Sequence, residues 1–194
     1  MSKRVTKEFI ERNRQVDKIE IKKITTSEVA LLQIISIETY RETFGEYNSE
    51  ELMHSYLDEA YNINKLIEEL QNEQSEFYWA MFDGEIAGYL KLNVDQTQSE
   101  KMGAHYLEIE RIYIRSTFKA KGIGSTLMAV AAQRAKEQQK AAIWLGVWEG
   151  NHVALRFYKK HGFSHHSEHI FYMGDDAQTD YIFVKKINGG ETNE

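Results

Sequence analysis

Hydrophobic and polar positions follow two different periods along the chain, and the alternation between them predicts an α/β order of elements. Period-two patterns, or short apolar runs bounded by turn residues, predict strands over 19–24, 77–82, 85–94, 106–114, 142–147, 163–173 and 179–187. Helical spacing of apolar residues predicts helices over 27–44, 49–61, 62–72, 122–138 and 151–160. Ser49 and Asn62 are suited to cap two of these helices, and Asp83-Gly84 is typical of a two-residue hairpin turn.

The pattern shows no internal repeat and no break in composition, so we expect one α/β domain over residues 19–188. A polar extension (residues 1–18) precedes it, and a flexible tail (residues 189–194) follows it. The chain lacks cysteine, which excludes disulfides, thiolate metal sites and a cysteine nucleophile. Its net charge of −6 disfavours nucleic-acid binding. No stretch reads as a membrane span or a signal peptide, so we expect a cytoplasmic protein.

The junction between the strand 106–114 and the helix 122–138 carries the first chemical signal. Backbone N–H groups and the positive end of the helix dipole face outward there, which suits a pyrophosphate. Gly122 and Gly124 allow a close approach, and Lys119 and Lys121 supply positive charge. A Walker loop would end in Gly-Lys-Ser/Thr, and a dinucleotide fingerprint would need glycine where Leu127 stands. An ordinary tight loop is the alternative.

Two motifs then resemble those of the GNAT N-acetyltransferases. Lys119-x-x-Gly122-x-Gly124 resembles their acetyl-CoA signature, although that signature usually begins with Arg or Gln. The run NHVALRFYKKHGF, over 151–163, resembles their N-x-x-A-x-x-F-Y-x-x-x-G-F element. The motifs occur in the family's order, and the resemblance extends from residue 19 to residue 187. It implies a mixed, mostly antiparallel sheet of about seven strands with helices on both faces, and acetyl-CoA as cosubstrate.

The same resemblance implies which residues contact the cofactor. Backbone groups of the strand 106–114 would hold the pantetheine arm like an added strand, and the glycine loop would hold the pyrophosphate. The implied cofactor-binding residues are Ile112, Tyr113, Ile114, Lys119, Ala120, Lys121, Gly122, Ile123, Gly124, Ser125 and Asn151.

A pair of acids in the strand 106–114 gives the candidate base. Strict alternation would place Glu108, Glu110, Ile112 and Ile114 on one face, with Leu107, Ile109, Arg111 and Tyr113 on the other. Buried carboxylates are costly without a partner or a task. An amine of pKa about 10.4 is almost fully protonated near neutrality, and a carboxylate acting through water can remove its proton. The resemblance favours Glu110 as the base, with Glu108 second. The alternative is that these acids pair with Arg111 or Arg115, or line an edge strand.

The helix 151–160 supplies the candidate acid. Asn151, Ala154 and Tyr158 share one face of that helix. The resemblance implies that Asn151 hydrogen-bonds the cofactor and that Tyr158 protonates the departing thiolate, whereas a half-buried packing tyrosine is the alternative. Histidines also crowd the segment 161–169, but neighbouring strand residues face opposite ways, so we expect surface histidines and no metal site.

The acceptor is suggested by a narrower resemblance, to bacterial PaiA-type spermidine/spermine acetyltransferases. It rests on IETYRETFGEYN, LEIERIYI, IWLGVWEGN and FYMGDDAQTD. Residues 38–47 mix acids with aromatics, as a polyamine groove would, and the alternative is an amphipathic helix with a solvated acidic face. The expected partner is a small-molecule amine, with a homodimer left open and neither nucleic acid nor membrane expected.

The predicted activity is therefore acetyl transfer from acetyl-CoA to a primary amine, foremost a polyamine, by direct attack in a ternary complex. The absence of cysteine excludes a cysteinyl acyl-enzyme. Two alternatives stay open. One is the same chemistry on an amino acid, an aminoglycoside or a protein N-terminus, and the other is a non-catalytic acyl-CoA-binding regulatory module.

Overall fold

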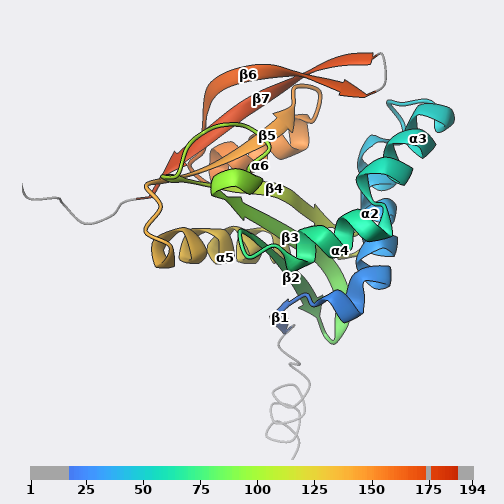
Figure 1. Cartoon of the computed structure of the whole chain (residues 1–194), viewed down its shortest axis with the longest axis horizontal. Coiled ribbons are helices and arrows are strands. Elements are labelled where there is room, and N and C mark those ends of the chain that lie inside the picture. The colour runs from blue at the N-terminus through green and yellow to red at the C-terminus, as the bar shows by residue number, and fades with distance from the viewer. Residues whose placement is uncertain (1–17, 174–175, 188–194) are drawn as a thin grey trace, which may run out of the picture.

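A seven-stranded sheet forms the centre of the protein, in the order β1-β2-β3-β4-β5-β7-β6 (Figure 1). The computed structural model describes residues 18–173 and 176–187. The strands are β1 (Ile19–Lys23), β2 (Ser75–Phe82), β3 (Glu85–Val94), β4 (Tyr106–Ile114), β5 (Ala142–Trp148), β6 (Ser164–Met173) and β7 (Asp176–Lys186). The helices longer than one turn are α2 (Val29–Phe44), α3 (Glu50–Ala60), α4 (Ile63–Gln71), α5 (Ile123–Glu137) and α6 (His152–Lys160). Neighbouring strands are antiparallel except β4 and β5, which are parallel. The predicted mixed, mostly antiparallel fold is confirmed.

Local chemistry explains several of the element boundaries. The Ser49 hydroxyl accepts a hydrogen bond from the Leu52 amide at the start of α3 (3.2 Å), and the Asn62 side chain accepts one from the Asn64 amide at the start of α4 (2.9 Å). Between β2 and β3, Asp83 and Gly84 both have positive φ, 50° and 87°, as a tight primed turn requires. The predicted caps and the predicted hairpin are confirmed.

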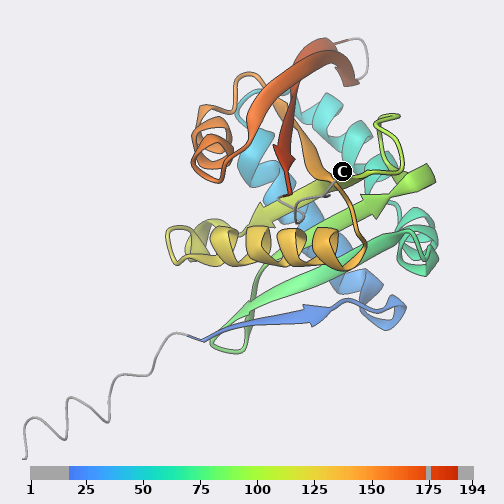
Figure 2. The same cartoon turned by 90° about the vertical axis from the view of Figure 1, so that its left-hand side faces the viewer.

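Helices cover the two faces of the sheet and enclose two separate cores (Figure 2). Residues of α5 and α6 pack with alternate side chains of β3, β4 and β5 in one core, which includes Leu107, Leu127 and Leu145. The opposite core lies under α2, α3 and α4 and includes Leu32 and Trp79. The central strands therefore present one set of side chains to α5 and the other set to α2–α4, and the second set contributes the carboxylates of the candidate site below.

The parallel pair β4 and β5 separates soon after it forms. The two strands pair only at Tyr106, Leu107 and Glu108 of β4, which face Ala142, Ile143 and Trp144 of β5. Among the described residues, β4 continues to Ile114 without a partner on that edge, while its other edge stays paired with β3. The sheet is therefore split in the middle, with backbone groups of β4 facing the opening.

The expected alternation along β4 is wrong, because the strand contains a β-bulge at Glu110. Lys91 of β3 pairs with Arg111 and Leu92 pairs with Ile109, so Glu110 is an extra residue. A bulge leaves one residue unpaired and resets which face the following side chains occupy. Glu108 and Arg111 thus both lie on the α2–α4 side. Ile112 and Ile114 pack instead against the α5 core, with Leu107 and Ile109.

Lys18, which we expected in the polar extension, pairs with the turn between β2 and β3. The Lys18 amide donates to the Asp83 carboxylate (3.1 Å) and its carbonyl accepts from the Asp83 amide (3.2 Å), so Lys18 continues the edge of β1. The rest of the predicted extension, and residues 188–194 with the predicted tail, lie outside the described residues. Within the described part of the chain, no helix is long and apolar enough to cross a membrane.

Candidate active site

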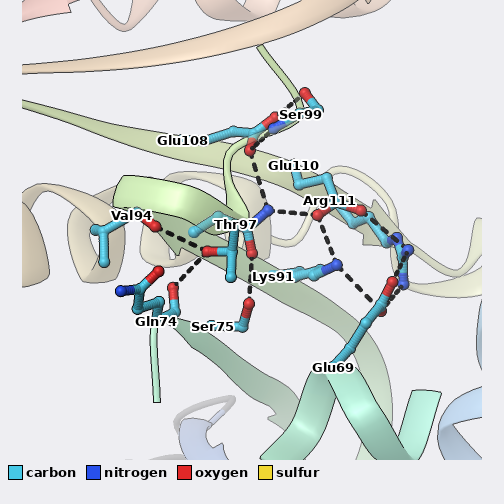
Figure 3. Close-up of polar contacts among 11 residues, drawn as sticks. Glu69, Gln74, Ser75, Lys91, Val94, Thr97, Ser99, Glu108, Glu110 and Arg111 are labelled. Atoms are coloured by element: carbon cyan, nitrogen blue, oxygen red, sulfur yellow. Dashed lines mark hydrogen bonds and ion pairs between the residues drawn. The ribbon is translucent and has the colours of Figure 1, made fainter. Parts of the chain in front are cut away.

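A buried network of charges lies where β3, β4 and α4 meet (Figure 3). The Lys91 ammonium contacts Glu110 at 2.6 Å and Glu69 at 3.0 Å. The Arg111 guanidinium contacts the same two carboxylates, each at 2.9 Å. Two cations thus face two anions. The side chains of Lys91 and Arg111 are only 4% and 9% exposed, so their charges depend on these partners rather than on water.

An amide joins this network to the second acid of β4. The Asn93 side chain, fully buried, donates from Nδ2 to both Glu108 (3.0 Å) and Glu110, while the Ser75 hydroxyl donates to its Oδ1 (2.9 Å). Glu108 also accepts from the backbone amide of Ser99 (2.9 Å) and from its hydroxyl. Ser99 itself is exposed. The buried Glu108 carboxylate therefore reaches the surface through one hydroxyl group.

The pKa values of Glu108 and Glu110 are shifted in opposite directions. Burial would raise the pKa of Glu110, but the charges on Arg111 and Lys91 outweigh it and hold that pKa at about 2. Burial, followed by the charge on Glu110, raises the pKa of Glu108 above its ordinary value. Two carboxylates close together repel each other, and here the acid whose pKa this repulsion raises is Glu108. Glu110 is an ionised member of the network with little tendency to accept a proton.

Glu110→Gln should lower the free energy of unfolding at pH 7 by about 3 kcal/mol, because Lys91 and Arg111 would then share Glu69 alone. The depressed pKa sets the pH dependence. The ionised Glu110 stabilises the fold above its ordinary pKa of 4.5, and this contribution is lost as the pH falls towards 2. Urea unfolding at pH 7 and in mild acid measures both effects.

Glu50→Gln is the matched control, since Glu50 pairs with Arg41 at 2.9 Å but its side chain is 86% exposed. Exposed pairs contribute little, so this variant should stay within about 1 kcal/mol of the parent. Equal midpoints for the two variants at pH 7 would contradict the structural role given to Glu110.

The loop before α5 has the geometry of an anion cradle. Ala120 and Gly122 both have positive φ, 63° and 82°, and Gly122 is the N-cap of α5 without any side-chain hydrogen bond to the helix. The first-turn amides of Ile123, Gly124 and Ser125 therefore have no capping group, and such amides bind phosphate well. Lys119 is exposed beside them. The residues present fit the pyrophosphate of a CoA molecule.

Two details of this loop differ from expectation. A Cβ atom on Gly124 would lie 3.0 Å from the Phe157 ring and 3.2 Å from the Ile114 side chain, so glycine is needed there for the packing of α5 against α6 and β4. Substitution of Gly124 by a bulky residue would therefore disturb the packing of the core as well as any phosphate site. The Lys121 ammonium lies over the ring of Phe82, 4.3 Å from its centroid, and so has a partner other than a phosphate.

Helix α6 brings Asn151 and Tyr158 to the same side of the split sheet. The Asn151 side chain accepts from the Ala154 amide (3.1 Å), so it caps the helix and leaves its amide nitrogen for another contact. Tyr158 is 8% exposed, packs against Phe163, and makes no hydrogen bond through its hydroxyl among the described residues. Burial raises the pKa of Tyr158, so the phenol stays protonated and can donate, although it is a weaker acid than a free tyrosine.

Of the clustered histidines, His165 and His166 are exposed, and His161 and His169 are half-buried. His161 lies 3.2 Å from the Ser125 hydroxyl at the start of α5, and its ring is tilted against that of Phe157. Sequence periodicity cannot show this contact, because it joins the end of one helix to the start of another. Among the described residues, no group of three His, Asp or Glu side chains is placed to hold a metal ion.

The α2–α4 side of the split carries aromatic side chains. Tyr40 stacks on Tyr56 (centroids 4.8 Å apart) and contacts Phe44 (4.6 Å), and Trp148 of β5 contacts Tyr47 (4.8 Å). The aromatic side chains of residues 38–47 therefore line this face of the sheet.

The acids of the region 38–47 behave differently. Glu38 pairs with Arg115, and Glu42 accepts from the amide and hydroxyl of Ser116. Both carboxylates thus hold the end of β4 instead of facing the opening.

Several residues of the site were not expected from the sequence. Lys91, Asn93 and Asp180 line the same face as Glu108, and Glu69 reaches it from α4. A signal for the first two was present, since Lys91 and Asn93 interrupt an otherwise apolar strand at spacing two. Glu69 and Asp180 had no such signal, because each reaches the site from an element distant in the sequence.

Comparison with known proteins agrees with this geometry. Residues 32–163 match the model of the Acetyltransferase (GNAT) family. An uncharacterised N-acetyltransferase of Lactobacillus delbrueckii subsp. lactis is 43% identical over 169 residues, which cover 86% of this chain and 98% of that protein. A spermidine N(1)-acetyltransferase of Thermoplasma acidophilum is 28% identical over 172 residues, covering 87% and 97%.

A solved structure shows the same architecture. The crystal structure of PaiA N-acetyltransferase from Thermoplasma acidophilum in complex with coenzyme A superposes with a TM-score of 0.73 at 27% identity, covering 87% of this chain and 99% of that one. The family match spans more than half of the chain, and the relative from Lactobacillus covers nearly all of it. The chain belongs to the GNAT family of N-acetyltransferases, enzymes that use acetyl-CoA as the acetyl donor.

Proposed function

We propose that this enzyme acetylates a polyamine such as spermidine or spermine, by direct attack of the free amine on acetyl-CoA. The observation that carries the proposal is the split between β4 and β5. An anion cradle and Tyr158 lie towards one side of it, and carboxylates and aromatic rings lie on the other. A cationic amine and an anionic donor would therefore meet in the opening from opposite faces of the sheet.

Binding of the donor would use the loop 119–125 for the pyrophosphate. The unpaired edge of β4 at Ile112, Tyr113 and Ile114 supports the proposal that its backbone groups hold the pantetheine arm. Asn151 would contribute its amide nitrogen, since its oxygen caps α6. Acetyl-CoA supplies a thioester, which an uncharged amine can attack.

We assign the base to Glu108 and give Glu110 a positioning role. A carboxylate with a pKa of about 2, held by two cations, accepts a proton poorly at neutral pH. Glu108 has the raised pKa, and the exposed Ser99 hydroxyl bonded to it offers a path for a proton from the acceptor. Lys91 and Arg111 would keep Glu110 ionised, and Asn93, which donates to both carboxylates, would fix their positions relative to each other.

Tyr158 would act on the leaving group. Because its pKa is raised, complete transfer of its proton to a thiolate is unfavourable. We propose instead that its hydroxyl donates a hydrogen bond to the sulfur as negative charge develops, with the final proton coming from water. Hydrogen bonds to charged groups contribute about 1.5–3 kcal/mol.

An acceptor panel tests the proposed substrate class. The purified protein is incubated with acetyl-CoA and, separately, spermidine, spermine, lysine, an aminoglycoside and a peptide with a free N-terminus, and free thiol is followed. The proposal expects the highest kcat/KM for the two polyamines. Efficient acetylation of one of the other amines, with the polyamines unreacted, would assign the chain to that amine instead.

Ser125→Asp tests the pyrophosphate site. A carboxylate in the first turn of α5 stabilises the helix, so the free energy of unfolding should change by less than about 1 kcal/mol. The same carboxylate would repel the phosphates and occupy their amides, so CoA should bind about tenfold more weakly. Calorimetry with CoA measures the effect.

Pantetheine, which lacks the phosphates, is the control ligand, and its affinity should be the same for the parent and the variant. Ser125→Ala is the control variant and should bind CoA like the parent. If Ser125→Asp binds CoA as tightly as the parent does, the pyrophosphate lies elsewhere.

A further inference from the structure

A half-buried carboxylate on β7 lies outside the network described above. Asp180 faces Trp148 of β5 on one side and His169 of β6 on the other, so all three side chains lie on the α2–α4 face of the sheet. Among the described residues, Asp180 makes no hydrogen bond or ion pair, although its carboxylate is partly shielded from water. Burial raises the pKa of Asp180, and the charge of the facing His169 offsets this rise only in part, so a bound cation would stabilise the ionised carboxylate.

Gly146 leaves space beside this carboxylate. A Cβ atom added to Gly146 would lie 3.8 Å from Asp180 Oδ2 and 4.0 Å from His169 Cε1, so both side chains border the bare backbone of β5. Gly146 is exposed and follows Trp144, the last residue of β5 paired with β4, by two positions. Asp180 therefore lies beside the part of β5 that borders the split.

Aromatic rings connect Asp180 with the carboxylates of β4. The pKa values of Tyr40 and Tyr56 are both raised, first by burial and in smaller part by the charge on Asp180; Tyr56 also feels the charge on Glu110. The Tyr56 phenol therefore lies within electrostatic reach of both carboxylates. The segment after α2 is joined to β7 on this side, since the Asn48 side chain accepts a hydrogen bond from Gln178 of β7 (3.3 Å).

The spacing of these groups suits a molecule with two cationic nitrogens. Strands β4 and β7 are separated by β5, so their backbones lie about 10 Å apart across the sheet at a normal strand spacing. Glu108 is opposite Trp144 and Asp180 is opposite Trp148, which adds an offset of about 13 Å along the strands. An amine that reacts near Glu108 could place a second ammonium near Asp180 only if several methylene groups separate the two nitrogens. Tyrosine and tryptophan faces along the way attract cations and pack against methylene groups.

We propose that Asp180 is the specificity-determining residue of the acceptor site and binds a second ammonium group of the substrate. The enzyme then selects diamines and polyamines over monoamines of the same length. This inference rests on the proposed function and adds to it the residue that recognises the nitrogen that does not react.

A pair of acceptors that differ only in the second ammonium tests the inference. Octylamine and 1,8-diaminooctane have the same carbon chain, and the diamine has as many bonds between its nitrogens as separate the two end nitrogens of spermidine. The parent enzyme should have the higher kcat/KM for the diamine. Asp180→Asn should lower kcat/KM for 1,8-diaminooctane about tenfold, mainly through KM, in the range of a hydrogen bond to a charged group. For octylamine the same variant should change kcat/KM less than twofold.

Asp58→Asn is the control variant, since Asp58 is an exposed residue of α3 paired with His54. It should leave both acceptors unaffected. An equal fall for 1,8-diaminooctane and octylamine in Asp180→Asn would mean a structural role and overturn the inference. A parent enzyme that acetylates the two amines equally well would overturn it too, while leaving the amine acetyltransferase activity intact. If the parent acetylates none of the amines tested, the proposed function itself fails.

Discussion

Glu108→Gln should reduce kcat/KM for the acceptor roughly 100-fold near pH 7, a usual size for the loss of a general base. The acceptor reaches the enzyme protonated, and Glu108 is the acid of β4 whose pKa is raised towards the working pH. Glutamine keeps the shape of the side chain and can still accept from Asn93, so the variant should fold. Its rate should recover in part as the pH is raised, because more of the amine is then uncharged.

Two results would oppose this assignment. One is a Glu108→Gln enzyme with the rate and pH profile of the parent. The other is the converse pattern, in which a stably folded Glu110→Gln enzyme loses the pH dependence of the rate while the Glu108→Gln enzyme keeps it. That pattern would return the base to Glu110 despite its contacts with Lys91 and Arg111.

Tyr158→Phe should lower kcat about 10- to 100-fold while leaving the affinity for CoA unchanged, because a hydrogen bond to a charged group contributes about 1.5–3 kcal/mol. The ring packs against Phe163, and the hydroxyl has no hydrogen bond among the described residues, so phenylalanine preserves the packing. The loss would therefore come from the reaction and not from folding. Steady-state kinetics together with calorimetry on CoA separate the two effects.

Full activity of the phenylalanine variant would transfer the role at the sulfur to water. A fall in kcat that is matched by a fall in thermal stability would instead indicate a packing role for Tyr158. The urea midpoint of the variant, which we expect to equal that of the parent, distinguishes these two cases.

Much of the fold follows from local patterns in the sequence. The period of the apolar residues placed the strand over 106–114 with the boundaries that β4 has, and Ser49, Asn62 and Asp83-Gly84 act as predicted. These features depend on neighbouring residues alone. The cradle before α5 was likewise recognisable from two glycines after a strand, although Gly124 serves the packing of Phe157.

The chemistry on β4 could not be predicted in the same way. A single extra residue at Glu110 reverses the faces of the residues that follow, and no local signal marks that bulge. The difference in pKa between Glu108 and Glu110 depends on Lys91 from β3 and Glu69 from α4, which only the folded chain brings together. Sequence periodicity therefore found both acids, while their division of roles depends on tertiary contacts.

Mass spectrometry of a complete reaction tests the central claim most directly. The enzyme is incubated first with acetyl-CoA alone and then with spermidine, and the masses of the protein and of the polyamine are both recorded. Direct transfer to a polyamine predicts an unmodified protein throughout and spermidine that gains one acetyl group. An acetylated protein intermediate that is consumed when spermidine is added, or unmodified spermidine in a reaction that acetylates another amine, would contradict it.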